Sequence, residues 1–219
     1  MTDFIICACC AAEAAQSAVL LRRRLDGLRV PHDVVEREGD EVTCTPLHIR
    51  DAMDRHPGKI ILFVDGGCQI VGTRDDLVRA ADVAGDIGLH VRTRVCPCGT
   101  PILTPHAETL VLRPTAKAHV FVSEWIGAWE RAASCGTAHD AILTVVLAGV
   151  PDLSVTLLAS EFCTTRRDNH PLPVILHERV GTAARTTAGR RGALLRWLRP
   201  KPASSGWDLS RFRRPAARG

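Results

Sequence analysis

Short apolar runs alternate along this chain with stretches in which apolar residues recur every three or four positions. The first pattern predicts strands and the second predicts helices. The strongest strand is 59–64, whose apolar residues are consecutive, as in a strand that is covered on both faces. The predicted strands are 4–7, 32–36, 59–64, 86–91, 109–112, 155–158 and 174–177. The predicted helices are 11–28, 45–56, 75–84, 115–133 and 139–148.

This alternation predicts an α/β fold, a single domain with a mostly parallel central sheet flanked by helices. The second helix is expected to begin with Thr45 as its cap and Pro46 at its first helical position. Residues 92–106 are rich in Cys, Gly and Pro and are expected to form a long loop. Long loops in compact domains are often functional.

Composition supports a folded domain with an aliphatic core. Of the 219 residues 46% are hydrophobic and 24% are charged, which excludes a mainly disordered chain, a coiled coil and a collagen-like protein. Tyr is absent and aromatic residues make up only 4%. There is no apolar run of about 18 residues and no basic leader at the start, so we expect a cytoplasmic protein without membrane spans.

Positive charge is concentrated at the end of the sequence. The net charge is +4, and residues 190–219 contain many Arg and a single acid, Asp208. The interpretation is a domain at 1–189 followed by a basic arm at 190–219. Arg with interleaved Trp and Phe favours binding to a polyanion such as DNA, and the alternative is a solvated terminus that packs its Trp side chains on the domain.

Nine cysteines raise the question of a metal or redox protein. The closely spaced groups are Cys7, Cys9 and Cys10, and Cys96 and Cys98. Neither group has the two-residue gap of a zinc knuckle, and no matching second pair follows. In a cytoplasmic protein, thiols that are not disulfide-bonded are the expectation, with a Cys-rich metal or redox protein as an alternative.

Candidate chemistry lies where the strongest strand ends, in Asp65, Gly66 and Gly67. Ligands of open α/β sheets bind at the carboxyl ends of strands, and the glycine pair would let a ligand or ion approach the backbone. The alternative is a simple Asp-Gly turn. The chain has no Gly-x-Gly-x-x-Gly, Walker A or Gly-x-Ser-x-Gly motif, which argues against Rossmann, P-loop and α/β-hydrolase proteins.

The order of these features resembles the GT-A glycosyltransferases, which use nucleotide-diphospho-sugar donors. The resemblance covers about residues 3–185. Its stretches are CCAAEAA at 9–15, PLHIRDAM at 46–53, IILFVDGG at 60–67, ETLVLRPT at 108–115 followed by Trp125 and His139-Asp140, and VILHER at 174–179.

The resemblance implies roles for particular residues. Asp65 would be the first acid of the Asp-x-Asp motif and would hold Mn²⁺ or Mg²⁺ or the donor ribose, and His177 would complete the metal shell. Asp140 would face the acceptor or donor sugar and, with Asp65, would be catalytic. The donor-binding candidates are Cys9, Cys10, Arg50, Asp65, Gly66, Gly67 and Thr109. The plainer alternatives are a strand-end His177 bonded to backbone and a helix N-terminal charge at Asp140.

The sequence departs from the motif at its second acid, which is Gly67 here. Asp65 and His177 could hold the ion with phosphate and water, Arg side chains could replace the ion, or activity could be lost. The expected function is sugar transfer to an acceptor hydroxyl. One acceptor is a hydroxylated DNA base, as in bacteriophage DNA-modifying glycosyltransferases, and the others are cell-envelope or small-molecule acceptors. The alternative function is a non-catalytic nucleic-acid-binding protein.

Overall fold

A seven-stranded sheet, ordered β10-β7-β5-β6-β3-β1-β2, forms the centre of the protein. The structure is a computed structural model that describes residues 3–11, 15–37, 41–95, 98–133, 139–165, 168, 170–177 and 212–213. The strands of this sheet are β1 (Phe4–Ala11), β2 (His32–Arg37), β3 (Ile60–Asp65), β5 (Ile87–Val95), β6 (Pro101–Leu112), β7 (Val155–Leu157) and β10 (Phe212–Arg213). The helices are α1 (Ala15–Gly27), α2 (Glu41–Arg55), α3 (Arg74–Ala81), α4 (Ala116–Ala133) and α5 (His139–Gly149).

The sheet is mostly parallel, as the sequence predicts. β1 runs parallel to β2 and β3, and β7 runs parallel to β5 and β10. β6 lies between β3 and β5 and is antiparallel to both. Its insertion joins the two parallel halves into one sheet.

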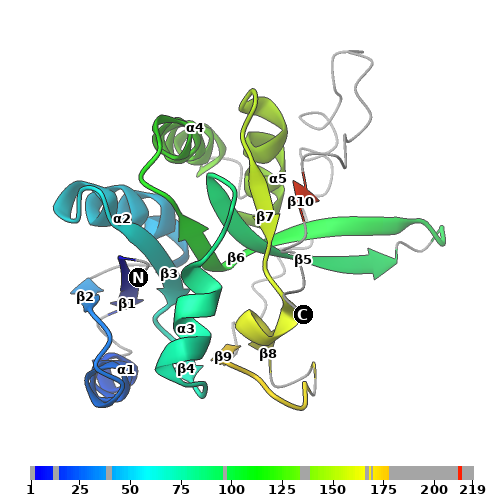
Figure 1. Ribbon diagram of the computed structural model, residues 1–219. Helices are drawn as coiled ribbons and strands as arrows, with labels where there is room; N and C mark the ends of the chain where they lie inside the picture. The colour runs from blue at the N-terminus through cyan, green and yellow to red at the C-terminus, as the bar shows by residue number, and fades with distance from the viewer. Residues whose placement is uncertain are drawn as a thin grey trace.

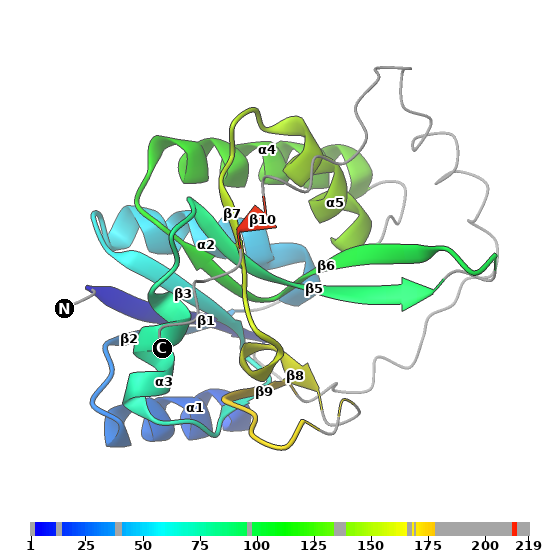
Figure 2. The ribbon, with the colours of Figure 1, turned by 45° about the vertical axis from the view of Figure 1, so that its right-hand side comes forward.

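Helices cover both faces of the sheet, with α2, α4 and α5 on one side and α1 and α3 on the other (Figures 1 and 2). The consecutive apolar run of β3 follows from this arrangement. Ile61 and Phe63 are buried in the cluster under α2 and α4, while Leu62 and Val64 are buried in the cluster under α1 and α3. Successive side chains of a strand point to opposite faces, so a strand covered on both faces must be apolar throughout.

A smaller sheet, ordered β4-β9-β8, packs beside the end of β3. Its strands are β4 (Cys68–Ile70), β8 (Thr164–Thr165) and β9 (Ile175–His177), and the short 3-10 helix η2 (Ser160–Phe162) precedes β8. β4 begins directly after the turn that ends β3, and it pairs antiparallel with β9. The small sheet therefore brings a distant part of the chain to the end of the central strand.

The expectation of a long loop at residues 92–106 is wrong. β5 and β6 form an antiparallel hairpin that extends beyond the rest of the sheet (Figure 2), with Thr93 opposite Leu103 and Val95 opposite Pro101. The prolines of β6 are tolerated because β3 pairs only with residues 109–112 of that strand. The edge of β6 that faces away from β5 is therefore unpaired by β3 where the prolines lie. Gly99, at φ 85°, lies in the turn.

The second helix also differs from its prediction. α2 begins at Glu41 rather than near Thr45, so Pro46 lies inside the helix instead of at its first position. Proline is most common in the first turn, which is why the sequence pattern placed the start there. Its missing N–H leaves one helical hydrogen bond unmade.

Cys7 and Cys163 are thiols, as expected, but Cys98 is disulfide-bonded, against the expectation.

The basic arm at 190–219 lies outside the described residues except for β10, which pairs with β7. The proposed domain boundary at 189 therefore stays a prediction.

Helix α3 begins with a capping box that makes its stability depend on pH. Asp76 accepts hydrogen bonds from the Thr73 N–H at 2.8 Å, from the Thr73 hydroxyl at 2.7 Å and from Arg79 at 2.6 Å. The bond from Arg79, followed by those from Thr73, lowers the pKa of Asp76 from 3.8 to about 2. The charged carboxylate is therefore favoured in the folded protein.

We expect Asp76→Asn to lower the free energy of unfolding by about 1–2 kcal/mol at pH 7. Because the folded-state pKa is depressed, the stabilisation is present above about pH 4 and is lost as the pH falls through about 2. Urea unfolding of both proteins between pH 7 and pH 2 measures the difference. Asp75→Asn, which removes another acid of the first turn, should change stability by no more than about 0.5 kcal/mol. An equal loss at pH 7 and pH 2 would contradict the prediction.

Candidate functional site

Asp65 is the last residue of β3 and lies beside Cys9 of β1 at the carboxyl end of the sheet. The Gly67 N–H donates to Asp65 Oδ1 at 3.3 Å, so one carboxylate oxygen accepts a hydrogen bond within the turn of residues 66–67. The turn interpretation is therefore correct, and it is compatible with a binding role for the rest of the carboxylate. Asp65 is only partly buried.

Gly66 is required by the close approach of β1. A Cβ at Gly66 would lie 2.4 Å from the Cys9 carbonyl oxygen and 2.5 Å from Cys10 Sγ. The Cys10 thiol donates to the Gly66 carbonyl at 3.5 Å. The space expected beside this glycine for a ligand is thus filled by β1, and the glycine instead fixes the turn that presents Asp65.

His177 reaches the same place from the small sheet. It ends β9, opposite Cys68 of β4, and its relative exposure is 1%. Its Nε2 lies 2.8 Å from Thr109 Oγ1, and Thr109 is opposite Val64, the residue before Asp65. The side-chain partner differs from the backbone partner that the plainer alternative expected.

The electrostatics of His177 favour a neutral imidazole. Burial lowers the pKa of His177 to about 4, against the opposing charge of Asp65, and the charges of Arg92 and His90 lower it further. Its Nδ1 is buried and has no hydrogen-bond partner in the described part of the chain. In the tautomer whose Nε2–H donates to Thr109, Nδ1 carries the lone pair that can bind a metal ion.

Asp65 and His177 stay the candidate ligands for a divalent cation, since the charge of Asp65 acts on His177. A carboxylate and an imidazole whose second nitrogen contacts Thr109 are suitable ligand types, and the Nδ1 of His177 has no hydrogen-bond partner among the described residues that would compete with an ion. A mixed oxygen and nitrogen set suits Mn²⁺ better than Mg²⁺. Gly67 contributes no side-chain ligand, so a bound phosphate and water would have to complete the shell.

No protein-family model matches the sequence, and neither does any curated protein. Solved structures do match. A glycosyltransferase involved in glycosylation of the major capsid of PBCV-1 has a TM-score of 0.57 at 10% identity, over 80% of this chain and 93% of that chain. The galactosyltransferase LgtC, in complex with donor and acceptor sugar analogues, has a TM-score of 0.55 at 12% identity, over 91% of this chain and 98% of that chain.

The chain has the GT-A glycosyltransferase fold. The glycosyltransferase GlyE of Streptococcus pneumoniae TIGR4 gives a TM-score of 0.51 at 12% identity, over 81% of this chain and 54% of that chain. The fold expected from the order of motifs is thus confirmed. None of the described helices has the length and apolar character needed to cross a membrane.

Within this GT-A fold, the structure unites some of the expected site residues and separates others. Thr109 and His177 are in contact at the junction of the two sheets. Thr109 is paired with Val64, the residue before Asp65, and the charge of Asp65 acts on His177. Cys9 and Cys10 lie behind that turn with buried side chains, so only their backbone could face a donor.

Arg50 and Asp140 lie on other elements. Arg50 is an exposed residue of α2. Asp140 is in the first turn of α5, and its side chain is outside the described part of the structure. Their assignment to the site therefore stays a prediction.

Sequence reasoning missed a polar network that holds the small sheet against the hairpin. Arg92 of β5 lies 3.1 Å from Asp168 and 3.9 Å from Glu108. Asp168 also accepts from the Thr165 N–H at 2.7 Å, and Thr165 is opposite His177 in the small sheet. The network thus supports the strand that carries His177. No spacing in the sequence connects these residues, so no local signal could have found them.

Proposed function

We propose that this protein is a glycosyltransferase that moves a sugar from a nucleotide-diphospho-sugar donor to an acceptor hydroxyl. The observation that carries the proposal is the buried His177, whose Nδ1 lacks a partner in the described residues, next to the carboxylate that ends the central strand of a GT-A fold. Carboxyl ends of strands are where α/β proteins bind their ligands.

The chemistry of transfer accounts for these residues. The departing group is a diphosphate, and a divalent cation, when bound, neutralises its charge. Asp65 and His177 would hold that ion, and Thr109 would keep the His177 ring in the tautomer that presents Nδ1. Asp140 is proposed to position or deprotonate the acceptor, and Arg50 and the backbone of Cys9 and Cys10 are proposed donor contacts.

The acceptor is proposed as a hydroxyl compound to be identified by experiment. LgtC is described with donor and acceptor sugar analogues, and the PBCV-1 enzyme acts in glycosylation of a capsid protein. Sugar acceptors are therefore the first to test. Hydroxymethylated DNA belongs in the same screen because residues 190–219 are strongly basic.

A donor screen tests the proposal. Purified protein is incubated with UDP-sugars and GDP-sugars, with Mn²⁺, Mg²⁺ or chelator, and release of the nucleoside diphosphate is measured with and without each acceptor. We expect release from one donor class with Mn²⁺, together with thermal stabilisation by that donor and ion. Absence of both stabilisation and release with every donor would overturn the proposal.

We expect Thr109→Val to weaken Mn²⁺ binding about tenfold, because the ring of His177 loses the hydrogen bond that orients it. Mn²⁺ titration by calorimetry or electron paramagnetic resonance measures the change. Thr93→Val, on the exposed part of the hairpin, is the matched control and should leave the affinity unchanged. An unaltered Mn²⁺ affinity in Thr109→Val would show that Thr109 does not position a metal ligand.

A further inference from the structure

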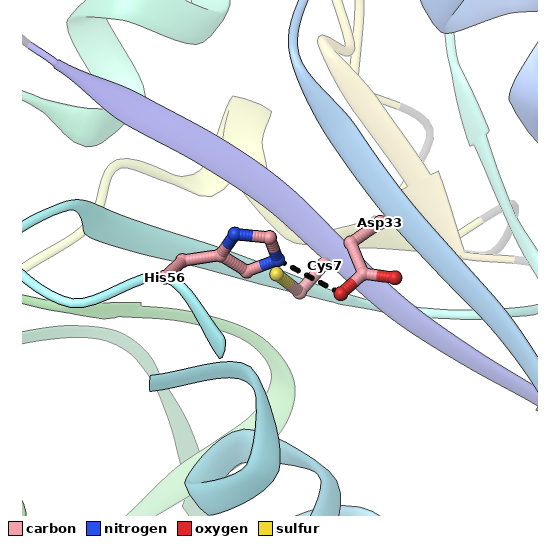
Figure 3. Close-up of side chains that lie close together, drawn as sticks. All are labelled: Cys7, Asp33 and His56. Carbon is pink, nitrogen blue, oxygen red and sulfur yellow. Dashed lines mark hydrogen bonds and ion pairs between the residues drawn. The ribbon is translucent and has the colours of Figure 1, made fainter. Parts of the chain in front are cut away.

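A second group of metal-ligating side chains lies on the α2 face of the central sheet. Cys7 of β1 and Asp33 of β2 are opposite each other in the parallel pair, and His56 follows the last residue of α2. A sulfur, a carboxylate oxygen and an imidazole nitrogen of these residues lie within 4.8 Å of one another. The three side chains point toward one another in Figure 3. We propose that Cys7, Asp33 and His56 bind a zinc ion.

The ligand types select zinc over the ions expected at Asp65. Thiolate, imidazole and carboxylate are the ligands of protein zinc sites, whereas Mg²⁺ and Mn²⁺ prefer oxygen. In a tetrahedral zinc site, bond lengths of about 2.0–2.3 Å place ligand atoms roughly 3.3–3.7 Å apart. The separations in the structure are at most 4.8 Å, so a ligand pair at that limit has to approach by about 1 Å. His56 Nε2 and Asp33 Oδ2, which are 2.9 Å apart, have to move apart slightly as the ion replaces their hydrogen bond.

The site is reachable from solvent. The side chains of His56 and Asp33 are 23% and 20% exposed, while Cys7 is buried. A zinc ion can enter from the His56 side and keep a water molecule in its fourth position, as zinc sites with three protein ligands do.

The charges around the cluster support the bound state. Asp33 Oδ2 lies 2.9 Å from His56 Nε2 and accepts from Arg55 Nε at 2.9 Å. Arg55 can remain on that carboxylate as an outer hydrogen-bond donor, the usual arrangement around a metal-binding carboxylate. The thiolate and the carboxylate together balance the two charges of zinc.

A nucleophilic cysteine is the competing interpretation of the same residues, and the geometry disfavours it. In a catalytic triad the acid binds the ring nitrogen that is remote from the nucleophile. Here the Nε2 of His56 is hydrogen-bonded to Asp33 Oδ2 at 2.9 Å (Figure 3), so that nitrogen is engaged with the acid. Burial, with the charge of Asp33 adding to it, raises the pKa of Cys7 to about 12, so the thiol is neutral without a metal.

Zinc titration of the full chain, stripped with a chelator, tests the proposal. We expect binding of one zinc per chain at this cluster and a rise of about 5–10 °C in the unfolding midpoint at hundredfold excess over the dissociation constant. Cobalt(II) in place of zinc should give a thiolate-to-metal charge-transfer absorption in the near ultraviolet, which reports a bound sulfur directly.

Variants assign that signal to the cluster. Cys7→Ser should remove the charge-transfer absorption, and His56→Gln, on the solvent side, should weaken zinc binding about 100-fold. Cys163→Ser, at the other buried thiol whose pKa is raised to about 12, is the matched control and should keep the signal. Asp65→Asn should also keep it, which separates this site from the proposed donor site.

Two results would overturn the proposal. One is an absence of zinc binding by the wild-type chain. The other is a cobalt signal that persists in Cys7→Ser. If Cys7→Ser fails to fold, His56→Gln decides the matter, because an unchanged zinc affinity in that variant would exclude His56 as a ligand.

Discussion

Replacing Asp65 by Asn is expected to reduce sugar transfer by about 10²–10³-fold while the fold remains intact. The substitution removes the charge that would hold the ion and the donor diphosphate. It keeps the side-chain oxygen that accepts from the Gly67 N–H, so the turn should persist. Turnover is measured as nucleoside diphosphate release with the donor found in the screen.

The matched control for this variant is Asp54→Asn, at an exposed carboxylate of α2. It should transfer sugar at the wild-type rate. The unfolding midpoint of Asp65→Asn should lie close to that of the wild type, which excludes misfolding as the cause of the lost activity. Full activity in Asp65→Asn would remove this carboxylate from the site.

Gly66→Ala is expected to lower the free energy of unfolding by about 2–3 kcal/mol, equivalent to about 5–10 °C in the unfolding midpoint. The new methyl group would lie 2.4 Å from the Cys9 carbonyl oxygen, a backbone atom that cannot turn away. Either β1 or the turn after β3 must move. Activity should fall as well, because the turn carries Asp65.

Gly27→Ala provides the control for Gly66→Ala. Gly27 is the last residue of α1, and a Cβ there meets nothing within 4 Å. Alanine at this position should be neutral or stabilising by about 0.5–1 kcal/mol, because it restricts the unfolded chain. Urea unfolding of both variants makes the comparison. Equal stability of Gly66→Ala and wild type would show that β1 yields to the methyl group without cost.

The predictions from periodicity succeeded where the local pattern and the burial agreed. β3 was recognised because both of its faces are covered, and the alternation of strands and helices gave the fold class. The predictions failed where a strand is short or where its sequence contains residues typical of turns. β4 and β8 are too short for any period to show, and the Pro, Gly and Cys of 92–106 concealed a hairpin whose free edge accepts proline.

For the candidate site too, local sequence patterns indicate some of the residues and give no sign of others. Asp65 could be proposed from sequence because it ends a strong strand, where binding residues are common. Arg92 and Asp168 could not, because their link is an ion pair across 76 positions of sequence. The group of Cys7, Asp33 and His56 likewise has no recognisable spacing, and it forms only because β1 pairs with β2 and the end of α2 packs against both.

The sequence by itself determined the order of strands and helices, the faces that must be buried and the acid at the end of the central strand, because each of these depends on residues close together in the chain. Only the tertiary structure decided that His177 contacts Thr109, that the charge of Asp65 acts on His177, and that Gly66 has no space for a side chain. These features depend on how strands pair across long separations. Such pairing is set by the packing of the whole core rather than by any local pattern.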